Sequence, residues 1–406
     1  MTALSHLKVI DLSRILAGPW ASQILADMGA KVIKIERPGE GDDTRHWGPP
    51  FLNDRDGKPT TEAAYYLSTN RNKQSVTIDI TCPEGQELVR ELVRGADILL
   101  ENFKVGGLAK YGLDYASLVS INPRLVYCSI TGFGQTGPYA PRPGYDVLLQ
   151  AMGGFMSVTG RREGEPGAGP QKVGVAVVDL LTGLYAATGI LGAIASREQS
   201  GKGQHIDLAL LDVEVACLAN QGMNYLVSGV SPKPMGNAHP NIVPYQDFPT
   251  ADGAMIVAVG NDGQFARLMA EIGQPGIGVD PAYATNGARV ANRDALLAII
   301  REATVQRTTG EWVEALERAN VPCGPVNSIA EVFADPQVVS REMARTIEHP
   351  LAGPIPIVAS PLRFSGTPVE YRNAPPLLGQ DTDEVLRDEL GLTAERIAEL
   401  AAKGVI

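Results

Sequence analysis

The sequence lacks several patterns by which metal, disulfide and nucleotide sites are recognised. Its four cysteines form no Cys-x-x-Cys pair and its five histidines show no ligand spacing, so we expect neither a disulfide framework nor a metal site. After the first expected strand the chain reads SRILAGPW rather than G-x-G-x-x-G, and no G-x-x-x-x-G-K-[ST] loop occurs. These absences argue against nicotinamide, flavin and nucleoside triphosphate sites.

We also expect neither an export signal nor a membrane-spanning segment. The opening residues, MTALSHLKVIDLS, show no basic leader with an apolar core, and we expect no later apolar run to be long enough to cross a bilayer. We therefore expect a protein of a reducing compartment, the cytoplasm or a mitochondrial matrix. The net charge of −11 argues against non-specific binding to nucleic acid.

What the chain does contain is an ordinary globular composition, with 44% hydrophobic and 20% charged residues in 406. That length predicts two domains. In the first part, short apolar runs alternate with helical segments, which is typical of crossover units and a parallel sheet. Between about residues 230 and 325, Pro, Gly and Asn turns surround short strands instead. We expect an α/β domain in residues 1–228, a smaller α+β domain in 229–328, and a return to the first domain in 329–406.

Ligands of a parallel sheet lie beyond the carboxyl ends of its strands. Basic residues gather near those ends, and Arg and Lys pair well with phosphates. Each of them could equally be a solvated loop charge. The candidates are Arg14, Arg37, Arg71, Lys73, Lys104 and Lys110.

Asp179 is the one carboxylate in the apolar stretch VAVVDLLTGLYAATGILGAI. An aspartate at the start of a helix is a favoured cap, because its oxygen accepts from free backbone N–H groups. The same position favours an ionised carboxylate, which could attack an activated acyl group. The residues alone leave both interpretations open.

A second segment, VAVGNDGQF, places Gly260 and Gly263 on either side of Asn261 and Asp262. Such a loop after a strand is usually a turn. It could also be a mobile lid over a site.

Six segments taken together resemble the class III coenzyme A transferases, a family that includes formyl-CoA transferase, carnitine CoA-transferase and α-methylacyl-CoA racemase. They occur in order along nearly the whole chain. The segments are LKVIDLSRILAGPWASQILADMGAKVIKIERPGEGDDTR, NRNKQSVTIDI, ENF, CSITGFGQTGP, VVDLLTGLYAA and SGKGQHIDLAL.

The resemblance implies a Rossmann-like large domain built from both chain ends, a small domain between them, and an interlocked ring dimer. It implies that Asp179 is the catalytic nucleophile, with a coenzyme A thioester as substrate and no other cofactor. It also implies a glycine-rich loop over the active site at Gly260–Gln264. The positions that match coenzyme A contacts are Ile15, Ala17, Arg37, Lys73, Asn102, Phe103 and Lys110.

Two positions separate the branches of this family. Leu16 stands where formyl-CoA transferase has glutamine, which argues against an oxalate-type site. Tyr145 stands where the racemases have histidine, and a phenol is a poor base near neutral pH. A racemase or a non-catalytic CoA-binding protein remain alternatives to a transferase.

The segments GDDTRHWGPPF and NIVPYQ are most similar to the branch that handles glutarate. They imply succinyl-CoA as donor and a short dicarboxylic acid as acceptor. A second carboxylate would need a cation or several hydrogen-bond donors, because a desolvated, unpaired carboxylate is costly. The candidates are Arg45, His46 and His239, although Arg45 could pair with Asp42 or Asp43 and His239 could be a turn residue.

Overall fold

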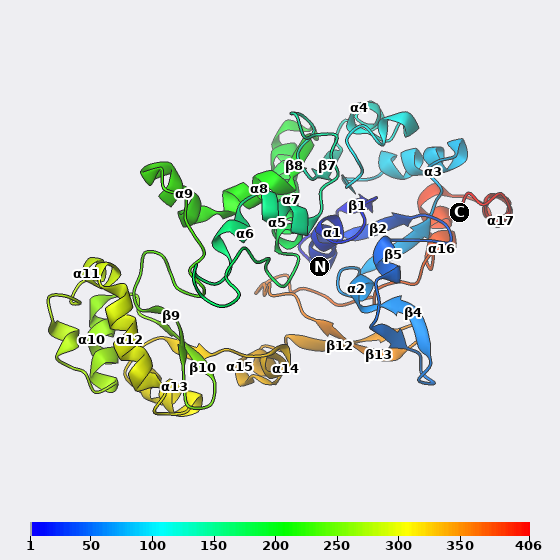
Figure 1. Ribbon diagram of the computed structural model, residues 1–406. Helices are drawn as coiled ribbons and strands as arrows, with labels where there is room; N and C mark the ends of the chain where they lie inside the picture. Colours follow the sequence, from blue (N-terminus) through cyan, green and yellow to red (C-terminus); the bar gives the residue numbers. More distant parts are fainter. Residues whose placement is uncertain (1) are drawn as a thin grey trace. The chain divides into compact units, whose positions relative to one another are not determined.

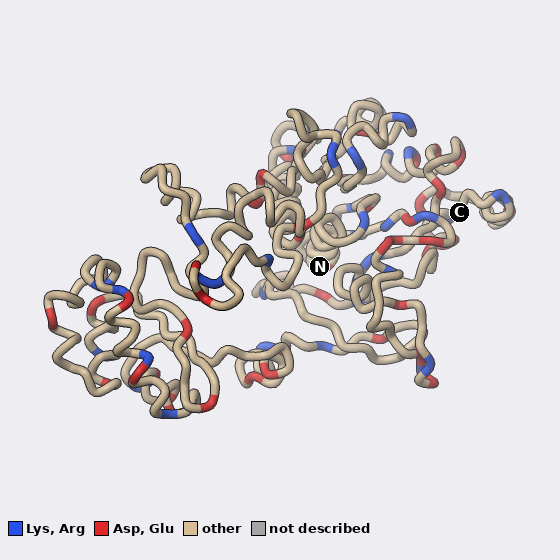
Figure 2. Tube along the Cα trace, viewed as in Figure 1, with Lys and Arg blue, Asp and Glu red and all other residues tan. Residues whose placement is uncertain are grey.

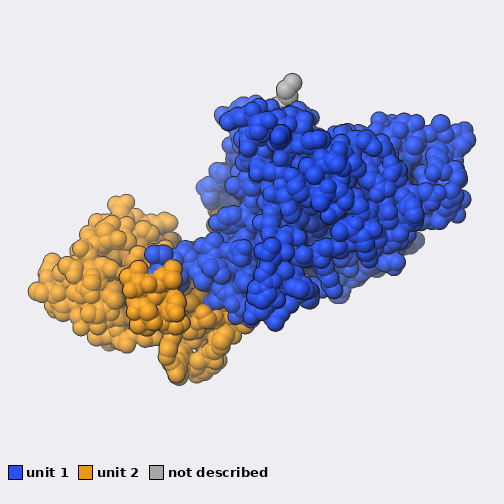
Figure 3. All heavy atoms as spheres, turned by 90° about the horizontal axis from the view of Figure 1, so that it is seen from above, with its two compact units in different colours: residues 1–155, 173–223, 337–406 blue, residues 156–172, 224–336 orange. Residues whose placement is uncertain are grey.

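The computed structural model describes residues 2–406, and these fall into two compact units (Figure 3). The first unit contains the chain up to Phe155 together with Val173–Met223 and Gln337–Ile406. The second contains Met156–Lys172 and Asn224–Pro336. The segment 156–172, which we had assigned to the large domain, packs with the second unit because Gly236 N–H donates to Gly160 O at 2.8 Å and Arg162 pairs with Asp294 at 3.1 Å.

A six-stranded sheet organises the first unit, and all of its strands are parallel (Figure 1). The parallel sheet predicted from the alternation of strands and helices is therefore confirmed. The strands lie in the order β5-β2-β1-β6-β7-β8. Their bounds are β1 Lys8–Asp11, β2 Lys31–Glu36, β5 Lys73–Thr77, β6 Ile98–Glu101, β7 Val126–Thr131 and β8 His205–Ala209.

Both faces of this sheet are covered, because alternate residues of a strand point to opposite faces. Val9 and Val32 belong to one hydrophobic core and their neighbours Ile10 and Ile33 to another. The first core includes helices α1 (Ala17–Asp27) and α7 (Val177–Ser200), with α8 (Leu210–Cys217) beside them. The second includes α3 (Pro83–Arg94), α16 (Thr382–Leu390) and α17 (Ala394–Ala402).

Shorter elements complete the first unit. Two antiparallel hairpins pair β3 with β4 and β12 with β13. The other elements are short helices at the connections between strands. Their bounds are β3 Phe51–Asn53, β4 Pro59–Ala63, β12 Ala344–His349, β13 Gly353–Val358, η1 Asp43–His46, α2 Ala64–Leu67, η2 Ala109–Tyr111, α4 Tyr115–Leu118, α5 Asp146–Met152 and α15 Pro336–Ser340.

The second unit combines a three-stranded antiparallel sheet with helices around its own core, which includes Phe248, Phe265 and Trp312. The helices α6, α9 and α15 each contain residues of both units. The bounds are α6 Phe155–Val158, α9 Ala219–Ser228, β9 Tyr245–Pro249, β10 Ala254–Ala258, α10 Asp262–Glu271, η3 Ile277–Val279, α11 Asn286–Ala291, α12 Arg293–Thr304, α13 Thr309–Arg318, β11 Cys323–Pro325 and α14 Ile329–Ala334. Basic and acidic residues are both scattered along the trace of each unit (Figure 2).

Helix α7 corrects one expectation from the sequence. It has 24 residues, and an 18-residue window within it has a mean hydropathy of 1.7, so by length and composition alone it could cross a membrane. In the fold this helix supplies Val178, Ala186 and Ile190 to the core on one face of the sheet. The small residue Gly183 permits this packing, because a Cβ there would lie 2.7 Å from the carbonyl oxygen of Ala17 in α1.

Candidate active site

A pocket of about 400 Å³ opens at the carboxyl edge of the sheet, where ligands of parallel sheets bind. Asp179 lies in its wall, and so do Ile15, Ala17, Asn102, Phe103 and Lys110, for which the family resemblance implies contact with coenzyme A. The remaining lining includes Arg14 and Leu16 of the same turn as Ile15, together with Lys104–Val105, Ile130–Gly132 and Arg142–Tyr145.

Asp179 occupies the first turn of α7 but does not cap it. The N-cap position is Ala176, whose side chain makes no cap. Instead, Asp146 from the start of α5 accepts hydrogen bonds from the backbone N–H of Val178 at 2.8 Å and of Asp179 at 3.4 Å. Gln150 in turn donates to the other oxygen of Asp146 at 2.6 Å. The capping task therefore falls to Asp146, and the Asp179 carboxyl group is left to face the pocket.

Two effects raise the pKa of Asp179 to about 7. Burial is the larger, and the negative charge of Asp146 adds to it. A carboxylate that is partly desolvated in this way is a stronger nucleophile than one in water, provided that it is ionised.

Tyr65 of α2 lies within electrostatic reach of the same two carboxylates. Burial raises the pKa of its phenol to about 12, with the charges of Asp179 and Asp146 as further causes. The phenol therefore stays protonated and can donate a hydrogen bond. Its ring packs edge-on against Trp47, with 5.2 Å between the ring centroids.

The turn between β1 and α1 forms one wall of the first pocket and leads through Ile15 to Ala17, two of the predicted coenzyme A contacts. Asn102, the residue after β6, holds this turn: its Oδ1 accepts from Arg14 N–H at 2.9 Å and its Nδ2 donates to Arg14 O at 2.7 Å. Asn102 thus contributes to the site partly by fixing the backbone beside Ile15.

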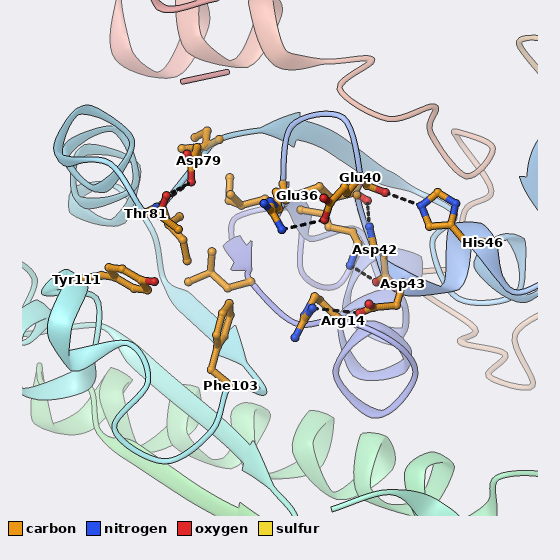
Figure 4. Close-up of a pocket in the computed structure, with 17 residues that line it drawn as sticks. Arg14, Glu36, Glu40, Asp42, Asp43, His46, Asp79, Thr81, Phe103 and Tyr111 are labelled. Carbon is orange, nitrogen blue, oxygen red and sulfur yellow. Dashed lines mark hydrogen bonds and ion pairs between the residues drawn. The ribbon is translucent and has the colours of Figure 1, made fainter. Parts of the chain in front are cut away.

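A second pocket of about 420 Å³ adjoins the first and shares Arg14, Phe103 and Tyr111 with it (Figure 4). In the close-up, Phe103 and Tyr111 line one side, and Asp43 and His46 lie on the other. Arg14 pairs with Asp43 at 3.1 Å. Arg37 also lines this pocket, and its exposed guanidinium pairs with Glu40 at 2.8 Å. The two pockets are therefore neighbours, with Arg14, Phe103 and Tyr111 lying between them.

The family of the chain follows from direct comparison. A model described as CoA-transferase family III matches residues 4–382. The chain belongs to this family. It is accordingly an enzyme of the CoA-transferase type, and the resemblance inferred from the sequence is confirmed.

Individual relatives agree with this membership. The chain is 54% identical over 385 residues to a succinate–glutarate CoA-transferase of Agrobacterium fabrum, covering 95% of each protein. It is 42% identical to the human succinyl-CoA:glutarate CoA-transferase, over 99% of this chain and 90% of that one. Among solved structures, a CAIB/BAIF family protein from Brucella suis superposes with a TM-score of 0.83 at 50% identity, over 96% of this chain and 99% of that one.

Several residues that the family resemblance or the sequence nominated do not line either pocket. Lys73 is fully buried, and its ammonium donates to Asn70 at 2.8 Å, to Pro19 O at 3.0 Å and to Asp11 at 3.3 Å. Burial lowers its pKa to about 8 although Asp11 opposes the shift. The side chain of Lys73 is therefore paired in the interior, and it lines neither of the two pockets.

Arg45 and Arg71 are committed in the same way. Arg45 donates to both oxygens of Glu36, at 2.8 and 2.9 Å, and its guanidinium stacks on Tyr66 at 3.7 Å. Arg71 donates to Asp27 through two nitrogens, at 2.5 and 2.9 Å. Arg45 pairs with Glu36 rather than with Asp42 or Asp43, and it does not line the pocket that holds Asp179.

His239 and the expected lid belong to the second unit. Asn261 caps α10 by accepting from Gln264 N–H at 2.9 Å, and Gln264 Oε1 accepts from Gly260 N–H at 2.7 Å. Asp262 pairs with the buried Arg289 at 2.8 Å. The loop around Gly263 is thus an ordered helix start in this structure, and its role as a lid stays a prediction. His239 Nδ1 accepts from Asn241 N–H at 3.1 Å, as a turn residue does.

Three residues of the first unit were missed by sequence reasoning. Asp146 and Arg142 flank Tyr145 in PRPGYD, and Tyr65 follows β4. Arg142 and the exposed Tyr145 line the pocket with Asp179, and the Arg142 guanidinium lies 4.0 Å from the centre of the Tyr139 ring. A Gly-Tyr-Asp sequence before a helix was the available signal for Asp146.

Across residues 2–406, no group of three potential metal ligands is found.

Proposed function

We propose that this enzyme transfers coenzyme A from succinyl-CoA to a short dicarboxylic acid such as glutarate, with Asp179 as the covalent nucleophile. The observation that carries the proposal is the position of Asp179. Its side chain lines a pocket at the ligand-binding edge of the sheet. Asp146 caps the helix, so the Asp179 carboxyl group is not needed for capping. The activities of the Agrobacterium and human relatives support the choice of donor and acceptor.

In the first half-reaction a carboxylate oxygen of Asp179 attacks the thioester carbonyl carbon of succinyl-CoA. The carbon–sulfur bond breaks, and the products are a succinyl-aspartyl anhydride and CoA thiolate. The thiolate then attacks the side-chain carbonyl carbon of Asp179, succinate leaves, and an aspartyl-CoA thioester remains.

The second half-reaction reverses these steps with the acceptor. A glutarate carboxylate attacks the aspartyl thioester, expels the thiolate and forms a glutaryl-aspartyl anhydride. The thiolate attacks the glutaryl carbonyl carbon, which releases glutaryl-CoA and restores the Asp179 carboxylate. One thioester is exchanged for another, so the reaction needs no redox cofactor.

Developing negative charge on each carbonyl oxygen requires hydrogen-bond donors. We assign this task to backbone N–H groups at the start of α1, where Leu16 is the N-cap and supplies no side-chain acceptor. Leu16 and Ala17 line the same pocket as Asp179. Water must also be kept from the anhydride, and we assign that task to the Gly260–Gln264 loop.

Arg142 is our candidate for the second carboxylate of the acid. It lines the Asp179 pocket, and no ion pair of its guanidinium occurs within residues 2–406. Arg14 in the same pocket is already paired with Asp43. An unpaired guanidinium suits a carboxylate well because the two can form parallel hydrogen bonds.

We also propose an interlocked homodimer located in the cytoplasm, or in the mitochondrial matrix of a eukaryote. Large apolar side chains of the first unit stay exposed along the helices beside the sheet, including Leu184, Tyr185 and Val215. A second copy of the chain would bury such a surface. All four cysteines are free, which is consistent with a reducing compartment.

Mass spectrometry after incubation with succinyl-CoA tests the mechanism. We expect a coenzyme A adduct on the peptide that carries Asp179 and none on the Asp179→Asn variant. Intact coenzyme A binding without adduct or transfer would favour a non-catalytic binding protein. Exchange of the α-proton of a methyl-branched acyl-CoA, without transfer, would favour a racemase.

A further inference from the structure

The turn from Ser13 to Ala17 is held by side chains from outside it. Lys34 of β2 donates to Ser13 O at 2.7 Å, and Asn102 bonds both backbone groups of Arg14. Ile15 N–H lies 3.2 Å from each carboxylate oxygen of Asp42. Side chains from β2, from the loop eight residues beyond Lys34 and from the distant Asn102 therefore fix three consecutive residues of the pocket wall.

Ile15 is the strained residue of this turn. Its φ of +72° lies in the left-handed region, where a β-branched side chain is a clear outlier because its Cβ crowds the backbone. Such a conformation persists only where the surroundings impose it. The bond from Ile15 N–H to Asp42 is the contact that acts on this residue directly.

Asp42 is itself rigidly held. The side chains of Asp42 and Lys34 are fully buried and pair at 2.8 Å. Asp42 Oδ1 also accepts from the backbone and the hydroxyl of Thr44, at 2.9 and 2.8 Å, and Asp42 N–H donates to Glu36 at 2.9 Å. Burial alone would raise the pKa of Asp42, but Lys34 and Thr44 outweigh it and lower the pKa to about 2. The acceptor for Ile15 is thus charged across the working pH range.

The turn is coupled to the proposed nucleophile through helix packing. Ala17 O lies so close to α7 that a Cβ at Gly183 would be 2.7 Å away. Gly183 is four residues after Asp179 and therefore one helical turn beyond it on the same face. A shift of the turn would change both the ligand contacts of Ile15 and the distance from the α1 N–H groups to Asp179.

We propose that Asp42, anchored by Lys34, is a positioning residue for coenzyme A transfer that holds Ile15 in its left-handed conformation. The inference rests on the proposed function, since the turn matters only if a thioester is bound beside Asp179. It also explains the GDDTR segment: Asp42 braces the turn, and Arg45 braces Glu36, which holds Asp42.

The test compares Asp42→Asn with the double variant Ile15→Gly/Asp42→Asn. Asparagine presents an N–H₂ group to Lys34 and removes one acceptor from Ile15. We expect Asp42→Asn to lower kcat/KM for succinyl-CoA by about 10- to 100-fold, because small misplacements at a reacting centre have effects of that size. Glycine adopts a positive φ without a clash, so the double variant should recover a substantial part of the loss.

Glu389→Gln is the matched control. Glu389 pairs with Lys8 and Lys31 at the amino ends of β1 and β2, the opposite edge of the same two strands. This control should lower the melting temperature and leave KM and kcat unchanged. If Asp42→Asn loses stability like the control and keeps wild-type kcat and KM, or if glycine gives no recovery, the positioning role is wrong.

Two further measurements keep the outcome decisive. If Asp42→Asn does not fold, Asp42→Glu keeps Lys34 paired while displacing the acceptor, and Ile15→Gly should again restore part of its kcat/KM. Calorimetric binding of free coenzyme A is measured for every variant. Wild-type protein that fails to transfer coenzyme A to glutarate would overturn the proposed function, whereas the effect of Asp42 on coenzyme A affinity would still support or refute its positioning role.

Discussion

Asp146 accepts a hydrogen bond from the backbone N–H of Asp179 and also raises the pKa of the Asp179 carboxyl group. One side chain therefore both fixes the helix of the proposed nucleophile and tunes the ionisation of its carboxyl group. In the proposed mechanism the reacting form of Asp179 is the carboxylate, so kcat/KM for succinyl-CoA should fall as the pH drops below about 7, the pKa of Asp179.

Replacement of Asp146 by asparagine should move this acidic limb to lower pH. Asparagine keeps an oxygen for Val178 N–H but carries no charge, so the pKa of Asp179 should decrease. The pH dependence of kcat/KM measures the shift. Asp212→Asn on α8 is the control, because it removes one negative charge from a residue that does not shift the pKa of Asp179. The pH profile of this variant should match the wild type. An unmoved limb in Asp146→Asn would show that Asp146 does not tune the nucleophile.

Asp179→Asn should abolish transfer and stabilise the fold at alkaline pH. Folding raises the pKa of Asp179 from an ordinary 3.8 to about 7, so the ionised carboxylate costs stability above pH 7. That cost disappears as the pH falls through 7 toward 3.8, where both states become protonated. We expect a gain of about 1–3 kcal/mol at pH 8 and no difference at pH 3.5. Urea unfolding at the two pH values measures it, and equal stability at pH 8 would contradict the raised pKa.

Lys73 and the exposed basic residues should respond in opposite ways. Lys73→Met leaves Asp11 buried without its nearest cation and should destabilise the protein by about 3 kcal/mol, while the KM of the folded enzyme changes little. Arg37→Ala and Lys110→Ala should leave the melting temperature near that of the wild type. They should raise KM for succinyl-CoA more than they lower kcat, because binding to the distant part of a ligand is shared by ground and transition states.

Melting temperatures and steady-state kinetics of these three variants distinguish a basic residue that stabilises the fold from one that binds the ligand. A raised KM without loss of stability in Lys73→Met would return Lys73 to the coenzyme A site. An unchanged KM in both Arg37→Ala and Lys110→Ala would remove those two residues from it.

The contrast between Lys73 and Lys110 shows where sequence reasoning reaches its limit. The alternation of strands and helices was enough to predict the parallel sheet and the edge at which ligands bind. It could not show which basic residues near that edge point inward. Lys34 and Lys73 are buried because Asp42 and Asp11 meet them from other segments, and no local pattern records those pairs.

The same reason explains why Asp146 was missed and Asp179 was found. Asp179 interrupts an apolar stretch, which is visible in the sequence, but its cap comes from a residue 33 positions earlier. A helix whose N-cap is alanine gives no sign of its distant capping partner. The family resemblance nominated Asp179 and the coenzyme A contacts of the turn. The contact of Asp42 with Ile15 N–H, and the pairing of Asp42 with Lys34, became visible only in the folded structure.

Arg142→Met should change the choice of acid more than the handling of coenzyme A. If the guanidinium binds the second carboxylate, its loss should lower kcat/KM for glutarate by about 10- to 100-fold, since hydrogen bonds to charged groups contribute about 1.5–3 kcal/mol. Butyrate has a similar length and no second carboxylate, so its already low kcat/KM should be unaffected. Arg94→Met, which breaks an exposed pair with Glu91 on α3, is the control. A panel of acceptors with succinyl-CoA as donor measures these values. Only a residue that contacts the second carboxylate can distinguish glutarate from butyrate. An equal loss of kcat/KM for both acids would therefore show that Arg142 does not bind that carboxylate.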